Sequence, residues 1–112
     1  MRKRTAVVLV ALIVGAAAAL PVLAATPKFN GTVGPGFTIS MAKKPTKAGK
    51  TTIVVSDKSS IHNFHLKGPG VNVATSVPAT GSKSFTVTLK KGKYTFLCDP
   101  HPTTMKGSFT IK

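Results

Sequence analysis

The chain has 112 residues, 42% of them hydrophobic, and a formal net charge of +14 at neutral pH. Beyond residue 24 every basic residue is lysine, so the arginine that reads bases through paired hydrogen bonds is absent and the composition argues against a nucleic-acid partner. The single cysteine, Cys98, excludes a disulfide within the chain. The length of residues 25–112 suits one small domain with a modest core.

The N-terminus has the pattern of an export signal. Basic residues at positions 2–4 precede an apolar run over residues 5–20, and small residues follow up to Ala25. We expect residues 1–24 to be a signal peptide cleaved after Ala24, which would make the protein periplasmic, extracellular or associated with the cell envelope. A retained N-terminal membrane anchor is the alternative, although the apolar run is short for a spanning helix.

The remaining chain predicts many short strands. Residues 25–36 form a linker or an edge strand, and residues 37–112 form the domain. Within the domain, apolar and polar residues alternate with the period of a strand, and Gly- or Pro-containing turns separate the runs. The pattern predicts an all-β fold, an antiparallel sandwich or barrel. The predicted strand segments are residues 37–41, 51–56, 84–89, 94–97 and 108–111.

His62 and Cys98 each extend a row of apolar residues on one face of a predicted strand. The rows are Phe64 and Leu66 after His62, and Tyr94 and Phe96 before Cys98. Because side chains alternate between faces, both residues are predicted to face the core, one at the start of a strand and one at the end of another. His65 has the opposite parity and is expected at the surface, pointing away, whereas Met41 is expected in the core.

Three potential metal donors lie within eight residues: Cys98, His101 and Met105. With His62 as a second imidazole they make the donor set of a blue-copper site, which has a thiolate, two imidazoles and a weak axial thioether. Singly, such a cysteine or methionine is more often a core residue. The combination favours copper, and a zinc site would leave the methionine without a role.

The pair His62–Asn63 and the segment Cys98–Pro102, with Met105 beyond it, resemble the cupredoxins, especially the plastocyanin and amicyanin group. The resemblance spans residues 37–112 and implies a Greek-key antiparallel β-sandwich with one type 1 copper ion at one end. It also implies that His62, Cys98, His101 and Met105 are the copper ligands.

The resemblance further implies roles around the ligands. His101 would come near the surface as the electron port, and Asn63 would tie the two ligand segments together by hydrogen bonding. Asp99, Pro100 and Pro102 are expected to support the ligand loop, since proline fixes the backbone angle φ and removes an amide donor.

These residues predict an exported one-electron carrier whose copper cycles between Cu(II) and Cu(I), and not an enzyme. Copper enzymes of this superfamily need further histidine-rich centres, but the chain has three histidines. A copper-binding protein for delivery or resistance is the alternative. The formal charge of +11 over residues 25–112 suits acidic redox partners or an anionic envelope surface, and we expect a monomer.

Overall fold

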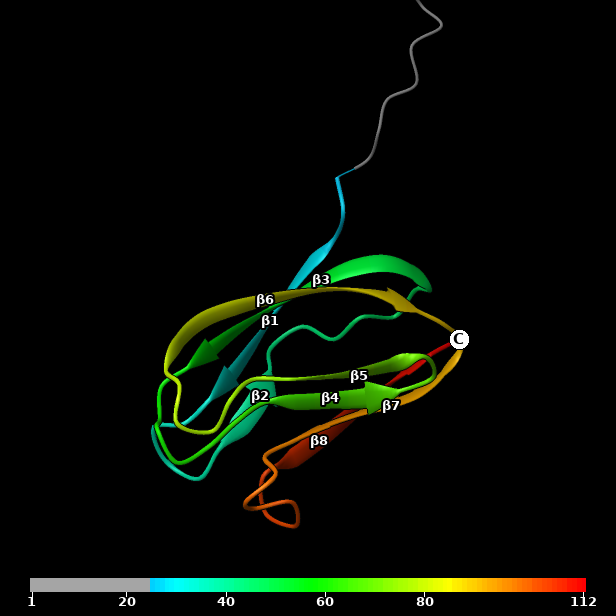
Figure 1. Cartoon of the computed structure of the whole chain (residues 1–112). Coiled ribbons are helices and arrows are strands. Elements are labelled where there is room, and N and C mark those ends of the chain that lie inside the picture. Colours follow the sequence, from blue (N-terminus) through cyan, green and yellow to red (C-terminus); the bar gives the residue numbers. More distant parts are fainter. Residues whose placement is uncertain (1–24) are drawn as a thin grey trace, which may run out of the picture.

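The structure is a computed structural model that describes residues 25–112, so the expected signal peptide lies outside the described residues. Two four-stranded sheets pack face to face (Figure 1). This part of the chain contains no helix, and so none long and apolar enough to cross a membrane. The strands are β1 (Lys28–Val33), β2 (Ile39–Met41), β3 (Gly49–Asp57), β4 (His65–Gly68), β5 (Val71–Ala74), β6 (Gly81–Leu89), β7 (Gly92–Leu97) and β8 (Lys106–Ile111).

One sheet has the strand order β2-β1-β3-β6 and the other has β5-β4-β7-β8. The all-β prediction is confirmed, but the expectation of a wholly antiparallel sandwich is wrong in one place, because β1 and β3 are parallel. β2 pairs antiparallel on one side of β1, and the chain then crosses to the other side to form β3. β3 therefore runs opposite to β2 and in the direction of β1.

The prediction of a linker or an edge strand at residues 25–36 is wrong for β1. It pairs with β2 on one side and with β3 on the other, and is an inner strand. Gly31 interrupts its alternation because a Cβ there would lie 2.7 Å from the ring of Phe64. Because the ring of Phe64 occupies this space, the position carries no apolar side chain, and the alternation typical of a strand is missing from the sequence of β1.

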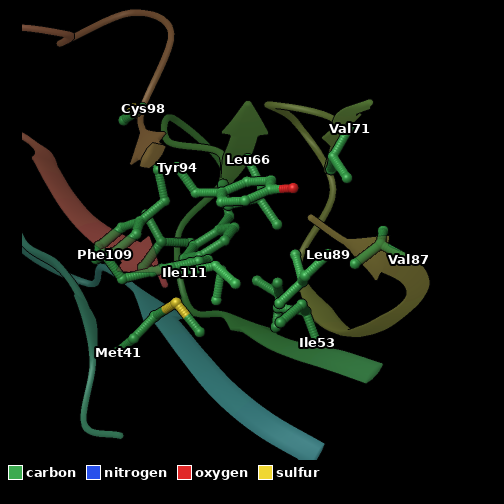
Figure 2. Close-up of a cluster of buried hydrophobic side chains, with 14 of the residues drawn as sticks. Met41, Ile53, Leu66, Val71, Val87, Leu89, Tyr94, Cys98, Phe109 and Ile111 are labelled. Atoms are coloured by element: carbon green, nitrogen blue, oxygen red, sulfur yellow. The ribbon is translucent and has the colours of Figure 1, made fainter. Parts of the chain in front are cut away.

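The core lies between the two sheets and follows the predicted alternation. Met41 is 4% exposed and packs in it, as expected. Figure 2 shows the cluster, with Cys98 at its margin. The buried hydrophobic residues are Val33, Met41, Ile53, Val55, Phe64, Leu66, Val71, Val87, Leu89, Tyr94, Phe96, Cys98, Met105, Phe109 and Ile111.

One end of the sandwich gathers the connections that matter for the site. Strands β1, β3, β5 and β7 end there, and β2, β4, β6 and β8 begin there, on the left in Figure 1. The loops over residues 58–64 and 98–105 meet at this end, and they carry the predicted ligands. We call it the metal end.

Candidate metal centre

Two turns built from side chains lead the chain from β3 to His62. The amide of Ser59 donates to Oδ1 of Asp57 at 3.0 Å, and the amide of Ile61 donates to Oγ of Ser59 at 3.3 Å. Short polar side chains favour such local bonds over a continued strand. The polar run before His62 therefore ends β3 and returns the chain to the core, where His62 is fully buried.

The segment from His62 to Phe64 is bonded to side chains of other segments. The amide of Asn63 donates to Sγ of Cys98 at 3.5 Å, and the amide of Phe64 donates to Oγ1 of Thr75 at 2.8 Å. These two amides donate to side chains instead of to a neighbouring strand, and β4 therefore begins at His65 rather than at His62. The predicted alternation still holds, since residues 62, 64 and 66 are all buried.

The second ligand segment is a closed loop between β7 and β8. The amide of Cys98 donates to the carbonyl of Met105 at 3.0 Å, which joins the two ends of the loop. Inside it, the amide of His101 donates to the carbonyl of Cys98, and the amide of Met105 donates to the carbonyl of His101. Pro100 and Pro102 lie exposed on this loop, where their missing amide donors leave no buried group unpaired.

Gly107 lies inside β8, just after the ligand loop, where it pairs with Phe96. A Cβ at this position would lie 2.3 Å from Cζ of Phe96. Gly107 therefore makes room for a core aromatic ring beside the ligand loop.

The structure brings three of the predicted ligands together. One donor atom from each of His62, Cys98 and His101 lies within 4.8 Å of the others. Sγ of Cys98 is 3.7 Å from Nδ1 of His62 and 3.7 Å from Nδ1 of His101. Metal–sulfur and metal–nitrogen bonds of about 2.3 and 2.0 Å can span this separation, so one metal ion would fit between the sulfur and each nitrogen. A thiolate with two imidazoles is the donor set that copper takes in blue-copper sites.

Burial differs among the donors. His62 and Cys98 are fully buried, whereas His101 is only half-buried. Met105 is fully buried at the end of the same loop, where it would supply the thioether of the set. Together the four residues fit one type 1 copper ion.

An exposed aromatic ring, Phe37, covers the two imidazoles. Its ring centroid lies 5.0 Å from that of His62 and 5.0 Å from that of His101, edge-on to both. The strand predicted over residues 37–41 included Phe37, but β2 begins at Ile39 and Phe37 is 62% exposed. The glycines and proline just before Phe37 are the one sequence signal that could have placed it in a loop.

Nε2 of His62 is buried and has no hydrogen-bond partner among residues 25–112. A neutral imidazole that offers Nδ1 to a metal carries its proton on Nε2. This nitrogen lies on the side of the ring away from Cys98, whose Sγ faces Nδ1. The ring is therefore oriented by its packing and by the donor cluster rather than by a hydrogen bond.

Asn63 and Asp99 link the two ligand segments. The amide of Asp99 donates to Oδ1 of Asn63 at 2.8 Å, and Nδ2 of Asn63 donates to Oδ2 of Asp99 at 2.8 Å. Nδ2 of Asn63 also donates at 3.1 Å to the carbonyl of Thr75, the residue after β5. The expected tie between the segments is present, and Thr75 is a member that sequence reasoning missed.

His65 points away from the donor cluster, as its parity predicted, but its side chain is only 17% exposed. Its Nδ1 lies 2.8 Å from Oδ1 of Asp99. Burial raises the pKa of Asp99, but hydrogen bonds from His65 and Asn63, together with the charges of His65 and Lys67, outweigh it and hold that pKa below its usual value. Asp99 is therefore a carboxylate at neutral pH.

Comparison with known proteins agrees with this donor set. The sequence profile of copper binding proteins of the plastocyanin/azurin family matches residues 37–112. No curated protein matches the sequence.

Similar folds occur among solved structures. Reduced rusticyanin is 23% identical with a TM-score of 0.60, over 78% of this chain and 79% of that one. An auracyanin from Roseiflexus castenholzii is 21% identical with a TM-score of 0.55, over 80% and 99%. A pseudoazurin from Sinorhizobium is 21% identical with a TM-score of 0.55, over 78% and 75%.

Proposed function

The chain belongs to the plastocyanin/azurin family of copper-binding proteins, and on this premise we propose that it carries single electrons between redox partners. The observation that carries the proposal is the gathering of a thiolate and two imidazoles, from His62, Cys98 and His101, within 4.8 Å. Copper held by such a set with a distant thioether supplies a one-electron Cu(II)/Cu(I) couple.

The surrounding contacts suit a donor set that stays in place during electron transfer. The ligand loop is closed on itself by the bond from Cys98 to Met105. The segment with His62 is tied to the loop through Asn63 and to β5 through Thr75. Donors held from several segments move little between the two oxidation states, and a small rearrangement favours rapid electron transfer.

His101 is the proposed port for the electron. It is half-buried, while His62, Cys98 and Met105 are fully buried. Phe37 packs against its ring and is itself exposed. A partner that docks at the metal end can therefore approach this imidazole more closely than any other donor.

The histidine inventory supports a carrier rather than an enzyme. His62 and His101 belong to the donor set, and the ring nitrogens of His65 lie against Asp99 and Asn72. A second copper centre built on histidines would need ligands that this chain does not offer.

We further propose that the protein is exported and meets acidic redox partners. The sequence pattern before residue 25 and the lysine-rich character of residues 25–112 support this. Electrostatic steering of this kind raises association rates and is weakened by salt.

The first test is the spectrum of the Cu(II)-loaded protein. We expect an intense visible band from thiolate-to-copper charge transfer, and an electron paramagnetic resonance spectrum with the narrow copper hyperfine splitting of a type 1 site. A colourless Cu(II) form with a stoichiometric metal content would sink the proposal.

A second test separates a carrier from a protein that delivers copper. Electron self-exchange between oxidised and reduced protein is measured by NMR line broadening, and copper loss is measured by transfer to a Cu(I) chelator. A carrier exchanges electrons quickly and keeps its copper. Slow self-exchange with ready transfer to the chelator favours the delivery role instead.

A further inference from the structure

His65 is the one histidine outside the donor set, and both of its ring nitrogens are engaged. Nδ1 lies 2.8 Å from Oδ1 of Asp99, and Nε2 lies within hydrogen-bond distance of Oδ1 of Asn72 on β5. The ring thus bridges the neighbouring strand β5 to the ligand loop. It does so from the outer face of β4, opposite to the core-facing Leu66.

Both oxygens of the Asp99 carboxylate have partners on the chain that follows His62. Oδ2 accepts a hydrogen bond from Asn63, the residue after His62, and Oδ1 faces His65. Asp99 itself directly follows Cys98 in the chain. A side chain that fixes the Asp99 carboxylate therefore fixes the residue next to Cys98 in the turn from Cys98 to His101.

The contact between His65 and Asp99 is direct. A carboxylate oxygen only accepts, so Nδ1 of His65 is the donor to Oδ1 of Asp99. Lys67, two residues along the same face of β4, attracts the same carboxylate without a hydrogen bond.

We propose that His65 is a positioning residue of the copper centre, which holds the Asp99 carboxylate against the ligand loop through a hydrogen bond. This inference rests on the proposed one-electron function, because its consequence is the reduction potential. A carboxylate beside the donor set stabilises Cu(II) relative to Cu(I), since Cu(II) carries the larger positive charge. The hydrogen bond from His65 disperses the negative charge of Asp99 and therefore holds the reduction potential up.

The test compares His65→Gln with the matched control Lys67→Gln in copper-loaded protein. Both variants remove a side chain that interacts with Asp99 from the same face of β4, but only His65 is hydrogen bonded to it. We expect His65→Gln to lower the reduction potential more than Lys67→Gln, with the visible band retained in both. Equal shifts, or no shift in His65→Gln, would overturn the proposal.

A double variant isolates the contact with Asp99. In an Asp99→Asn background there is no carboxylate charge for the hydrogen bond to disperse, so His65→Gln should change the potential less than it does in the native chain. An undiminished effect in that background would mean that His65 acts through another group, against the proposal.

Metal-free protein gives an independent readout that does not depend on the variants folding. In nitrogen-15 NMR spectra at neutral pH, we expect a proton on Nδ1 of His65 that is protected from solvent exchange. A ring whose Nδ1 carries no protected proton would overturn the proposal. If wild-type protein forms no blue site, the proposed function fails, while this measurement still decides the contact.

Discussion

The two ends of β7 hold their side chains in opposite ways. Near its start, Tyr94 is fully buried and its hydroxyl donates to the carbonyl of Pro69 at 2.8 Å and accepts from the amide of Lys90 at 2.9 Å. Just past its end, Cys98 is also fully buried, but its Sγ meets one amide at 3.5 Å and two imidazole nitrogens at 3.7 Å.

The comparison shows how one strand serves both stability and chemistry. At the Tyr94 end, a polar group is buried with its hydrogen bonds made within the protein, which is the usual condition for burial. At the Cys98 end, the thiol and two imidazoles converge with only long contacts between them. The first arrangement stabilises the fold through hydrogen bonds within the protein, whereas the second suits the binding of a metal ion.

The largest expected effect comes from removing the thiolate. Cys98→Ser should abolish the intense visible band of the Cu(II) protein, because the band requires a copper–thiolate bond. The unfolding free energy of the metal-free variant should be close to that of the wild type. Serine is similar in size to cysteine, and its hydroxyl can still accept a hydrogen bond from the amide of Asn63. A retained blue band, measured by absorption spectroscopy, would rule out Cys98 as a ligand.

The complementary change is Tyr94→Phe at the opposite end of β7. It leaves the carbonyl of Pro69 and the amide of Lys90 without their partner, and we expect a loss of about 1–3 kcal/mol in unfolding free energy. Urea denaturation of the metal-free protein measures this loss, and the visible band should stay unchanged. Tyr94→Phe and Cys98→Ser thus serve as controls for each other.

A smaller effect is expected at the fourth donor. Met105→Leu should keep the blue band but raise the reduction potential, because loss of the thioether destabilises Cu(II) more than Cu(I). A rise on the order of 59 mV would correspond to a tenfold change for a one-electron couple. Met41→Leu is the matched control, since Met41 is buried in the core on β2, and it should leave the potential unchanged in voltammetry.

The smallest effect should come from the ring that covers the imidazoles. Phe37→Ala removes two edge-on contacts, each of which stabilises a buried aromatic pair by about 0.5–1.5 kcal/mol. Phe37 is largely exposed, so the lost stabilisation per contact should lie near the lower end of this range. We expect faster transfer of copper to a chelator with little change in unfolding. Ile61→Ala, at another exposed apolar residue next to His62, is the control and should leave the transfer rate near that of wild type.

Local alternation was enough to predict much of the fold and of the site. The faces of β6, β7 and β8 follow from the spacing of their apolar residues, and the same parity assigned His62 and Cys98 to the core and turned His65 away. This worked because side chains of an extended chain alternate whatever the partner strand is.

Pairing between distant segments was not predictable in this way. β1 has a glycine where the ring of Phe64 approaches, so the residues of β1 do not show the apolar alternation expected of an inner strand. The parallel pairing of β1 with β3 likewise depends on a crossing of the chain that no local period encodes.

The sequence by itself determined the donor types, their spacing and the faces on which they lie, because these depend on covalent order and strand geometry. Only the tertiary structure decided that Phe37 covers the imidazoles and that His65 bridges Asn72 to Asp99. These contacts join segments far apart in the chain. Their existence depends on which strands lie side by side and on which loops meet at the metal end.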